Sequence, residues 1–120
     1  MTGLSENFEK NRKDFIGHIF NIKGYSKGTC YGYNSDLGIW GAWLKENDLN
    51  WTEVTFHHVE QFSAWQMRHR NIKPHIINRR ASCLSSFYKW AMRNQVVEND
   101  PVSLAEKPRR PDRIPVYLDK

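Results

Sequence analysis

With 120 residues, the chain is long enough for one domain with its own hydrophobic core. Apolar residues make up 39% and aromatic residues 13%, which excludes a wholly disordered chain. No apolar run approaches the roughly 20 residues of a membrane span, and the polar N-terminus lacks a signal-peptide pattern. We therefore expect a soluble cytoplasmic protein, and the net charge of +5 makes a polyanion the first candidate partner.

The first helix is expected over residues 7–22, followed by Gly24 as its end. Its apolar stripe at helical spacing consists of Phe8, Phe15, Ile19 and Ile22. The pattern predicts one face of this helix in the core.

The second helix is expected over residues 27–47, with Ser26 as its N-cap. Its inward stripe consists of Tyr33, Leu37, Trp40 and Leu44. The helix also holds three internal glycines, Gly32, Gly38 and Gly41. Because each costs about 1 kcal/mol relative to alanine, we expect another group to pack close to this helix backbone.

The third helix is expected to follow the cap residue Thr55 and to run to about residue 70, with Val54 packing on Val59 as a hydrophobic staple. Its inward residues are Val59, Phe62 and either Trp65 or Gln66. The adjacent His57 and His58 point about 100° apart on a helix. They indicate a capped helix turn and not a metal site.

The fourth helix is expected over residues 74–95, with Pro74 at its first position. Its inward stripe consists of Ile77, Ala81, Leu84, Phe87, Tyr88 and Ala91. Asn99-Asp100-Pro101 is typical of a cap followed by a proline start, so a short helix is expected over residues 101–105. The three prolines and three arginines that follow predict an extended linker. The predicted fold is therefore an all-α bundle of four main helices and a short fifth, with a domain over residues 1–106 and a linker over 107–120.

Positive charge is concentrated in one part of the sequence. Residues 61–97 hold seven Lys or Arg residues and no Asp or Glu, whereas residues 1–60 carry more acids than bases. Such a segment suits a polyanion, with nucleic acid as the default candidate. The alternative is a solvated basic face without a partner.

The fourth helix presents one candidate binding face, opposite its apolar stripe. Arg and Asn side chains can reach base edges, Ser can bind phosphate, and small residues let a helix approach the DNA backbone. Arg80 lies nearer the rim of the core and is a candidate to pair with an acid of another helix. The outward positions are His75, Asn78, Arg79, Ser82, Ser86, Lys89 and Arg93.

The first turns of the second helix present another candidate face. Free N–H groups and the positive helix dipole favour phosphate at a helix N-terminus. An ordinary helix start is the alternative interpretation. The residues are Ser26, Lys27, Gly28, Thr29, Tyr31, Gly32 and Ser35.

Catalytic patterns are incomplete in this chain. The glycines at 24, 28 and 32 are not followed by Gly-Lys-Ser/Thr, as a P-loop requires. The sequence His69-Arg70-Asn71 lacks the aspartate of a kinase catalytic loop. The two cysteines, Cys30 and Cys83, lie too far apart in the sequence to suggest a metal site. We therefore expect no catalytic residues, metal, cofactor or small-molecule substrate.

From Phe15 to Leu118 the chain resembles the N-terminal core-binding domain of tyrosine recombinases, which include phage integrases and their Xer-type relatives. Four pieces of sequence in order carry the resemblance. They are Ser26–Thr29 with Tyr33, Leu37 and Trp40–Leu44; Trp51–Thr55 with Val59 and Phe62; Ile77–Ala91; and Asn99–Pro101 with Pro108 and Ile114–Leu118.

The resemblance implies a SAM-like helical bundle that, with a catalytic domain, clamps a recombination site on double-stranded DNA beside other recombinase protomers. It implies DNA contacts from the second and fourth helices, at Ser26, Thr29, Tyr31, Gly32, Ser35, His75, Arg79, Ser82, Cys83 and Ser86. Gly28 and Gly32 stand where the family often has polar side chains, which favours backbone contacts there. The family's catalytic residues belong to a domain that would begin where this chain stops, so Tyr117 is not expected to be a nucleophile.

Two other functions remain open at this point. The chain could be a helical protein-interaction module whose exposed aromatic residues dock a partner. It could also be a stand-alone protein that occupies recombination sites without cutting, which depends on whether Lys120 is a natural end.

Overall fold

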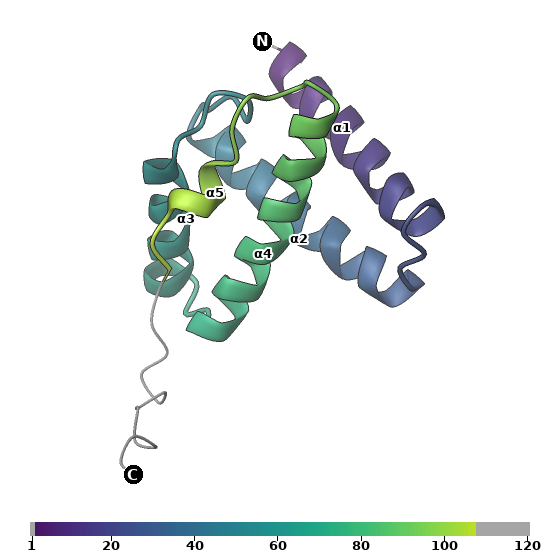
Figure 1. The fold of residues 1–120 in the computed structure, drawn as a ribbon. Helices are drawn as coiled ribbons and strands as arrows, with labels where there is room; N and C mark the ends of the chain where they lie inside the picture. The colour runs from purple at the N-terminus through teal and green to yellow at the C-terminus, as the bar shows by residue number, and fades with distance from the viewer. Residues whose placement is uncertain (1, 108–120) are drawn as a thin grey trace.

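A computed structural model describes residues 2–107 of the chain (Figure 1). The described part is helical and contains no strand, as predicted. Short connections join the helices into a bundle in which α1 packs on α2, α4 crosses α2, and α3 and α5 complete the core. The helices are α1 (Thr2–Asn21), α2 (Lys27–Glu46), α3 (Phe56–His69), α4 (Pro74–Arg93) and α5 (Pro101–Leu104).

Helix α1 differs at both ends from its prediction. It begins at Thr2, five residues before the predicted start, because the apolar stripe from which the helix was predicted begins only at Phe8. It ends at Asn21, where Tyr25 N–H donates to the Ile19 carbonyl and Gly24 adopts a φ of +70°. Ile22 therefore lies beyond the helix and is 74% exposed, so its assignment to the apolar stripe was wrong.

The predicted caps position α2, α3 and α5. The Ser26 hydroxyl accepts a hydrogen bond from Thr29 N–H at 3.1 Å. The Thr55 N–H donates to Nδ1 of His58 at 3.0 Å in a capping box, which confirms the capped turn expected there. Asp100 caps α5 through Val102 N–H, so each of these helices starts where the sequence predicts.

Two of the three internal glycines of α2 lie against α1. A Cβ added at Gly41 would come within 2.6 Å of the Phe8 ring, and one at Gly38 within 2.7 Å of the Arg12 guanidinium. Arg12 also ties the two helices together, because its Nε donates to Asn34 Oδ1 at 2.9 Å. Close packing within the chain is therefore confirmed for Gly38 and Gly41 but not for Gly32, whose Cβ position has open space around it.

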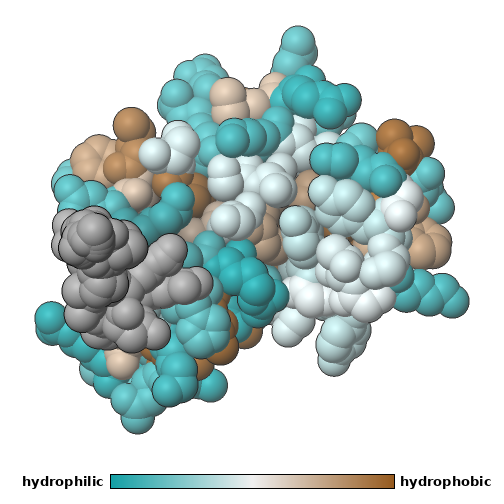
Figure 2. All heavy atoms as spheres, turned by 60° about the horizontal axis from the view of Figure 1, so that its bottom comes forward, coloured by the Kyte–Doolittle hydropathy of each residue, from teal (hydrophilic) through white to brown (hydrophobic). Residues whose placement is uncertain are grey.

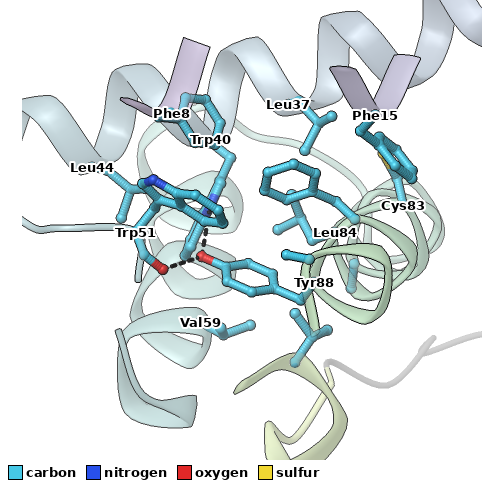
Figure 3. Close-up of a cluster of buried hydrophobic side chains, with 14 of the residues drawn as sticks. Phe8, Phe15, Leu37, Trp40, Leu44, Trp51, Val59, Cys83, Leu84 and Tyr88 are labelled. Atoms are coloured by element: carbon cyan, nitrogen blue, oxygen red, sulfur yellow. Dashed lines mark hydrogen bonds between the residues drawn. The ribbon is translucent and has the colours of Figure 1, made fainter. Parts of the chain in front are cut away.

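The core centres on an aromatic cluster that joins α2 and α4 to the α2–α3 loop (Figure 3). The Tyr88 hydroxyl donates to the Trp51 carbonyl at 2.7 Å and accepts a hydrogen bond from Trp40 Nε1 at 3.3 Å. Burial raises the pKa of Tyr88 far above its usual range. This network satisfies polar groups at the centre of the bundle, where water does not reach them.

The tryptophans belong mainly to the core. Trp43 is buried, and Trp65 and Trp90 are half-buried against the core cluster. Gln66 is only 1% exposed, so α3 turns Gln66 inward and Trp65 toward the edge. The predicted linker over residues 107–120 lies outside the described residues except for Lys107.

No helix in residues 2–107 combines the length and the apolar character needed to cross a membrane.

Candidate nucleic-acid interface

The structure brings the two candidate faces together. Helices α2 and α4 both begin on the lower side of the molecule in Figure 1, and α4 then crosses α2. At the crossing, the Cys83 thiol lies 3.7 Å from the Tyr33 carbonyl, and Arg79 Nη1 lies 3.6 Å from Asp36 Oδ2. Arg79, on the outward side of α4, therefore lies beside the first half of α2. We call the first half of α2 together with the outward side of α4 the α2–α4 face.

The first half of α2 contributes small and polar groups to this face. A Cβ added at Gly28 or Gly32 would find no atom within 4 Å, so the helix backbone is open to an approaching molecule. Tyr31 is 77% exposed. Figure 2 shows a pale surface of intermediate hydropathy on the side where α1 and α2 meet. The other predicted residues of this half that are exposed are Ser26, Lys27, Thr29 and Ser35.

The outward side of α4 contributes the cations. Asn78 and Ser86 are half-buried. Cys83 is only 2% exposed, so the DNA contact expected there is wrong. The remaining predicted residues share one exposed side of the helix, as their spacing of three, four or seven positions requires. They are His75, Arg79, Ser82, Lys89 and Arg93.

The α2–α4 face has a one-sided charge. Residues 24–35 and 61–97 contain no Asp or Glu, so no carboxylate comes from the first half of α2 or from α4 itself. The nearest acid, Asp36, has only 4% of its side chain exposed. A surface with exposed cations and a shielded carboxylate attracts a polyanion over distances of about 10 Å at ordinary salt.

Arg80 confirms the expectation that it pairs with an acid of another helix. Its Nε donates to Asp36 Oδ1 at 3.0 Å, and its Nη1 donates to the Gln66 side-chain oxygen. The group joins α2, α3 and α4 beneath the α2–α4 face. Sequence reasoning missed Asp36, and it named Gln66 only as a candidate inward residue and not as a partner of Arg80. Asp36 lies next to the stripe residue Leu37 in the sequence, and a buried acid requires a compensating partner.

The titratable groups beside this face are unsuited to nucleophilic chemistry. Burial, together with the negative charge of Asp36, raises the pKa of Cys83 to about 12 against the opposing effect of Arg79 and Arg80. Burial also raises the pKa of Tyr33, with smaller contributions from Tyr25 and Cys83. A thiol and a phenol that hold their protons at neutral pH are poor nucleophiles.

Metal ligation has no support in residues 2–107, where no group of three or more His, Cys, Asp or Glu side chains is placed to hold an ion. A hollow of about 260 Å³ lies away from the α2–α4 face, between α1, the second half of α2 and the following loop. It is lined by Phe8, Gly41, Leu44, Trp51 and their neighbours. The α2–α4 face itself is an open surface, suited to a macromolecule.

Comparisons with known proteins agree with the resemblance drawn from the sequence. Residues 13–95 match the family model described as phage integrase, N-terminal SAM-like domain. The chain is 30% identical over 115 residues to the tyrosine recombinase XerC of Treponema denticola, which covers 96% of this chain and 36% of that protein. It is 29% identical over 108 residues to XerD of Proteus mirabilis, covering 90% and 34% respectively.

A third relative, the tyrosine recombinase XerC of Bacillus subtilis, is 26% identical over 113 residues, or 94% of this chain and 37% of that protein. The chain thus spans about a third of the length of these relatives. No solved structure gives a significant match. Because the family model covers more than half of its residues, the chain belongs to the family of phage integrase N-terminal SAM-like domains.

Proposed function

We propose that this domain binds double-stranded DNA through the α2–α4 face and clamps a recombination site for a tyrosine recombinase. The observation that carries the proposal is that two separately predicted segments, neither of which contains an acid, meet where Arg79 of α4 faces the buried Asp36 of α2. The matched relatives are named tyrosine recombinases, which gives the DNA partner its context. Strand transfer would then be the work of a catalytic domain beyond these residues, with neighbouring protomers bound on the same site.

The division of contacts follows from the chemistry of each helix. Lys89 and Arg93 supply charge for phosphates, and His75 at the first turn of α4 adds a further polar contact. The open backbone at Gly28 and Gly32 allows close approach of a sugar–phosphate strand to α2. Phosphate contacts of this kind bind with modest affinity and a steep dependence on salt.

Fluorescence anisotropy with a labelled mixed-sequence duplex tests the proposal. Lys89→Ala and Arg93→Ala should each weaken binding and lower the slope of log K against log salt by about 1. Lys45→Ala is the matched control, because Lys45 is an exposed cation in the second half of α2, beside the hollow and away from the α2–α4 face. Its affinity should equal that of the wild type.

Two results would contradict the proposal. One is the absence of salt-dependent duplex binding by the wild type at low ionic strength. The other is an equal loss of affinity in Lys45→Ala and Arg93→Ala, which would place binding elsewhere or make it an effect of net charge alone. The first result would favour a protein-interaction module, for which the exposed Tyr31 and Leu104 are available apolar contacts.

A further inference from the structure

Two adjacent arginines of α4 share one buried carboxylate but use it differently. Arg80 is 9% exposed, and both Asp36 Oδ1 and Gln66 accept hydrogen bonds from it. Arg80 thus balances the buried charge of Asp36 within the fold. Arg79 has 60% of its side chain exposed, although it faces the same carboxylate.

The second carboxylate oxygen of Asp36 orients the side chain of Arg79. Oδ2 is buried and accepts no hydrogen bond, and Arg79 Nη1 lies 3.6 Å from it, an ion pair slightly longer than a hydrogen bond. A guanidinium has five N–H donors in a planar fork, so one edge can face Asp36 while the other edge faces solvent. The carboxylate thereby fixes the direction of an exposed cation.

We propose that Asp36 is a positioning residue, which holds the Arg79 guanidinium so that its outer edge meets a phosphate of bound DNA. The inference rests on the DNA-binding function proposed above. Immobilising a long side chain costs binding free energy, and a side chain already held in place avoids much of that cost. Lys89 and Arg93 lie on the same side of α4 but make no ion pair with an acid in the described part of the chain. Of these three cations, Arg79 is therefore the one whose side chain a carboxylate holds in place.

The positioning role and simple electrostatics predict changes of opposite sign in the DNA affinity of Asp36→Asn. Asp36→Asn removes a negative charge beneath a DNA-binding surface, which by charge alone strengthens binding. If Asp36 positions Arg79, the same change frees the guanidinium and weakens binding. The sign of the change in affinity therefore decides between the two.

A double-mutant cycle with the labelled duplex measures this sign. We expect Asp36→Asn to weaken binding by roughly three- to tenfold. In an Arg79→Gln background the same change should cause no further loss, because the side chain that Asp36 positions is gone. In an Arg93→Gln background, the matched control on the same helix, the full loss should remain.

Asp36→Asn leaves Arg80 with less compensation for its buried charge and can therefore unfold the chain. A second variant tests the proposal without changing a buried residue. Arg79→Lys changes only an exposed side chain and keeps the charge but lacks the planar fork. Positioning predicts that it loses most of the affinity lost in Arg79→Gln. NMR of the arginine Nε–H groups in the free chain adds a readout without DNA: Arg79 should be ordered in the wild type and mobile in Asp36→Asn.

The outcomes separate the two proposals. If the wild type does not bind duplex DNA, the proposed function fails and the inference falls with it. If the wild type binds and a folded Asp36→Asn binds more tightly, only the positioning role is overturned. Wild-type affinity in Arg79→Lys, or an Arg79 side chain already mobile in the wild type, would also overturn it.

Discussion

The two halves of α2 hold their glycines in opposite surroundings. In residues 36–46, Gly38 and Gly41 make room for side chains of α1. In residues 27–35, Gly28 and Gly32 face open space on the proposed DNA-binding surface. The comparison teaches that a glycine in a helix does not by itself indicate a close contact, because only the packing of the chain distinguishes a crowded backbone from an open one.

Gly41→Ala should have the largest effect on stability. Its new Cβ would lie 2.6 Å from the Phe8 ring, which is itself buried against Trp51 and Phe87. Overpacking of this kind costs about 1–3 kcal/mol, which outweighs the higher helix propensity of alanine. Urea denaturation should show a lower midpoint. A more stable Gly41→Ala variant would contradict the packing assigned to this half of α2.

Tyr88→Phe tests the core beneath the same half of α2. Removing the hydroxyl leaves Trp40 Nε1 and the Trp51 carbonyl without their hydrogen-bond partner in the buried cluster. The expected loss is about 1–3 kcal/mol of unfolding free energy, with unchanged DNA binding at temperatures where the variant is folded. Thermal denaturation followed by circular dichroism measures it, and a variant as stable as the wild type would show that the network contributes nothing.

Gly28→Ala and Gly32→Ala should act in the opposite direction on stability. Each adds a methyl group in open space and should stabilise α2 by about 1 kcal/mol. Both should nevertheless weaken duplex binding, because the methyl group would stand between the helix backbone and the DNA. Gly17→Ala in α1 is the control, since its Cβ would meet only Asn21 Nδ2 at 4.0 Å; it should stabilise without changing affinity.

If Gly28→Ala and Gly32→Ala were both more stable than the wild type and bound DNA with wild-type affinity, the first half of α2 would have no special need for glycine. The open glycines would then be ordinary surface positions.

Ionisation of the Cys83 thiol should have the smallest effect on stability at neutral pH. Cys83 packs against the first half of α2, with its thiol beside the Tyr33 carbonyl. Its pKa is raised from 9.0 to about 12 in the folded chain, so folding favours the protonated thiol. The unfolding free energy should therefore be unaffected below pH 9 and should fall as pH rises from 9 toward 12. Tyr33 and Tyr88 shift in the same direction, so the contribution of Cys83 is the difference between wild type and Cys83→Ser.

The helices and their inward faces could be predicted from the sequence because periodicity and caps are local signals. Ser26, Thr55, Pro74 and Asp100 each mark a helix start in the structure as they do in the sequence. Ile22 was misplaced because periodicity does not report where a helix ends. Local signals therefore predict the elements better than their boundaries.

The junction of the two candidate faces could not be predicted, because it depends on how α4 crosses α2. The sequence indicates that Arg80 needs an acid, but only packing selects Asp36 and adds Gln66 from α3. The same packing distinguishes Arg79 from Arg80, although the two residues are adjacent and chemically identical. The DNA-binding role of the face stays a prediction.

The most direct test of the α2–α4 face is an NMR titration of the ¹⁵N-labelled chain with a mixed-sequence duplex at low salt. The account predicts that amide shifts concentrate in residues 27–35 and on the outward positions of α4, with little change in residues 36–46. Shifts confined to the second half of α2 and the adjoining hollow, or no shifts at all, would contradict it.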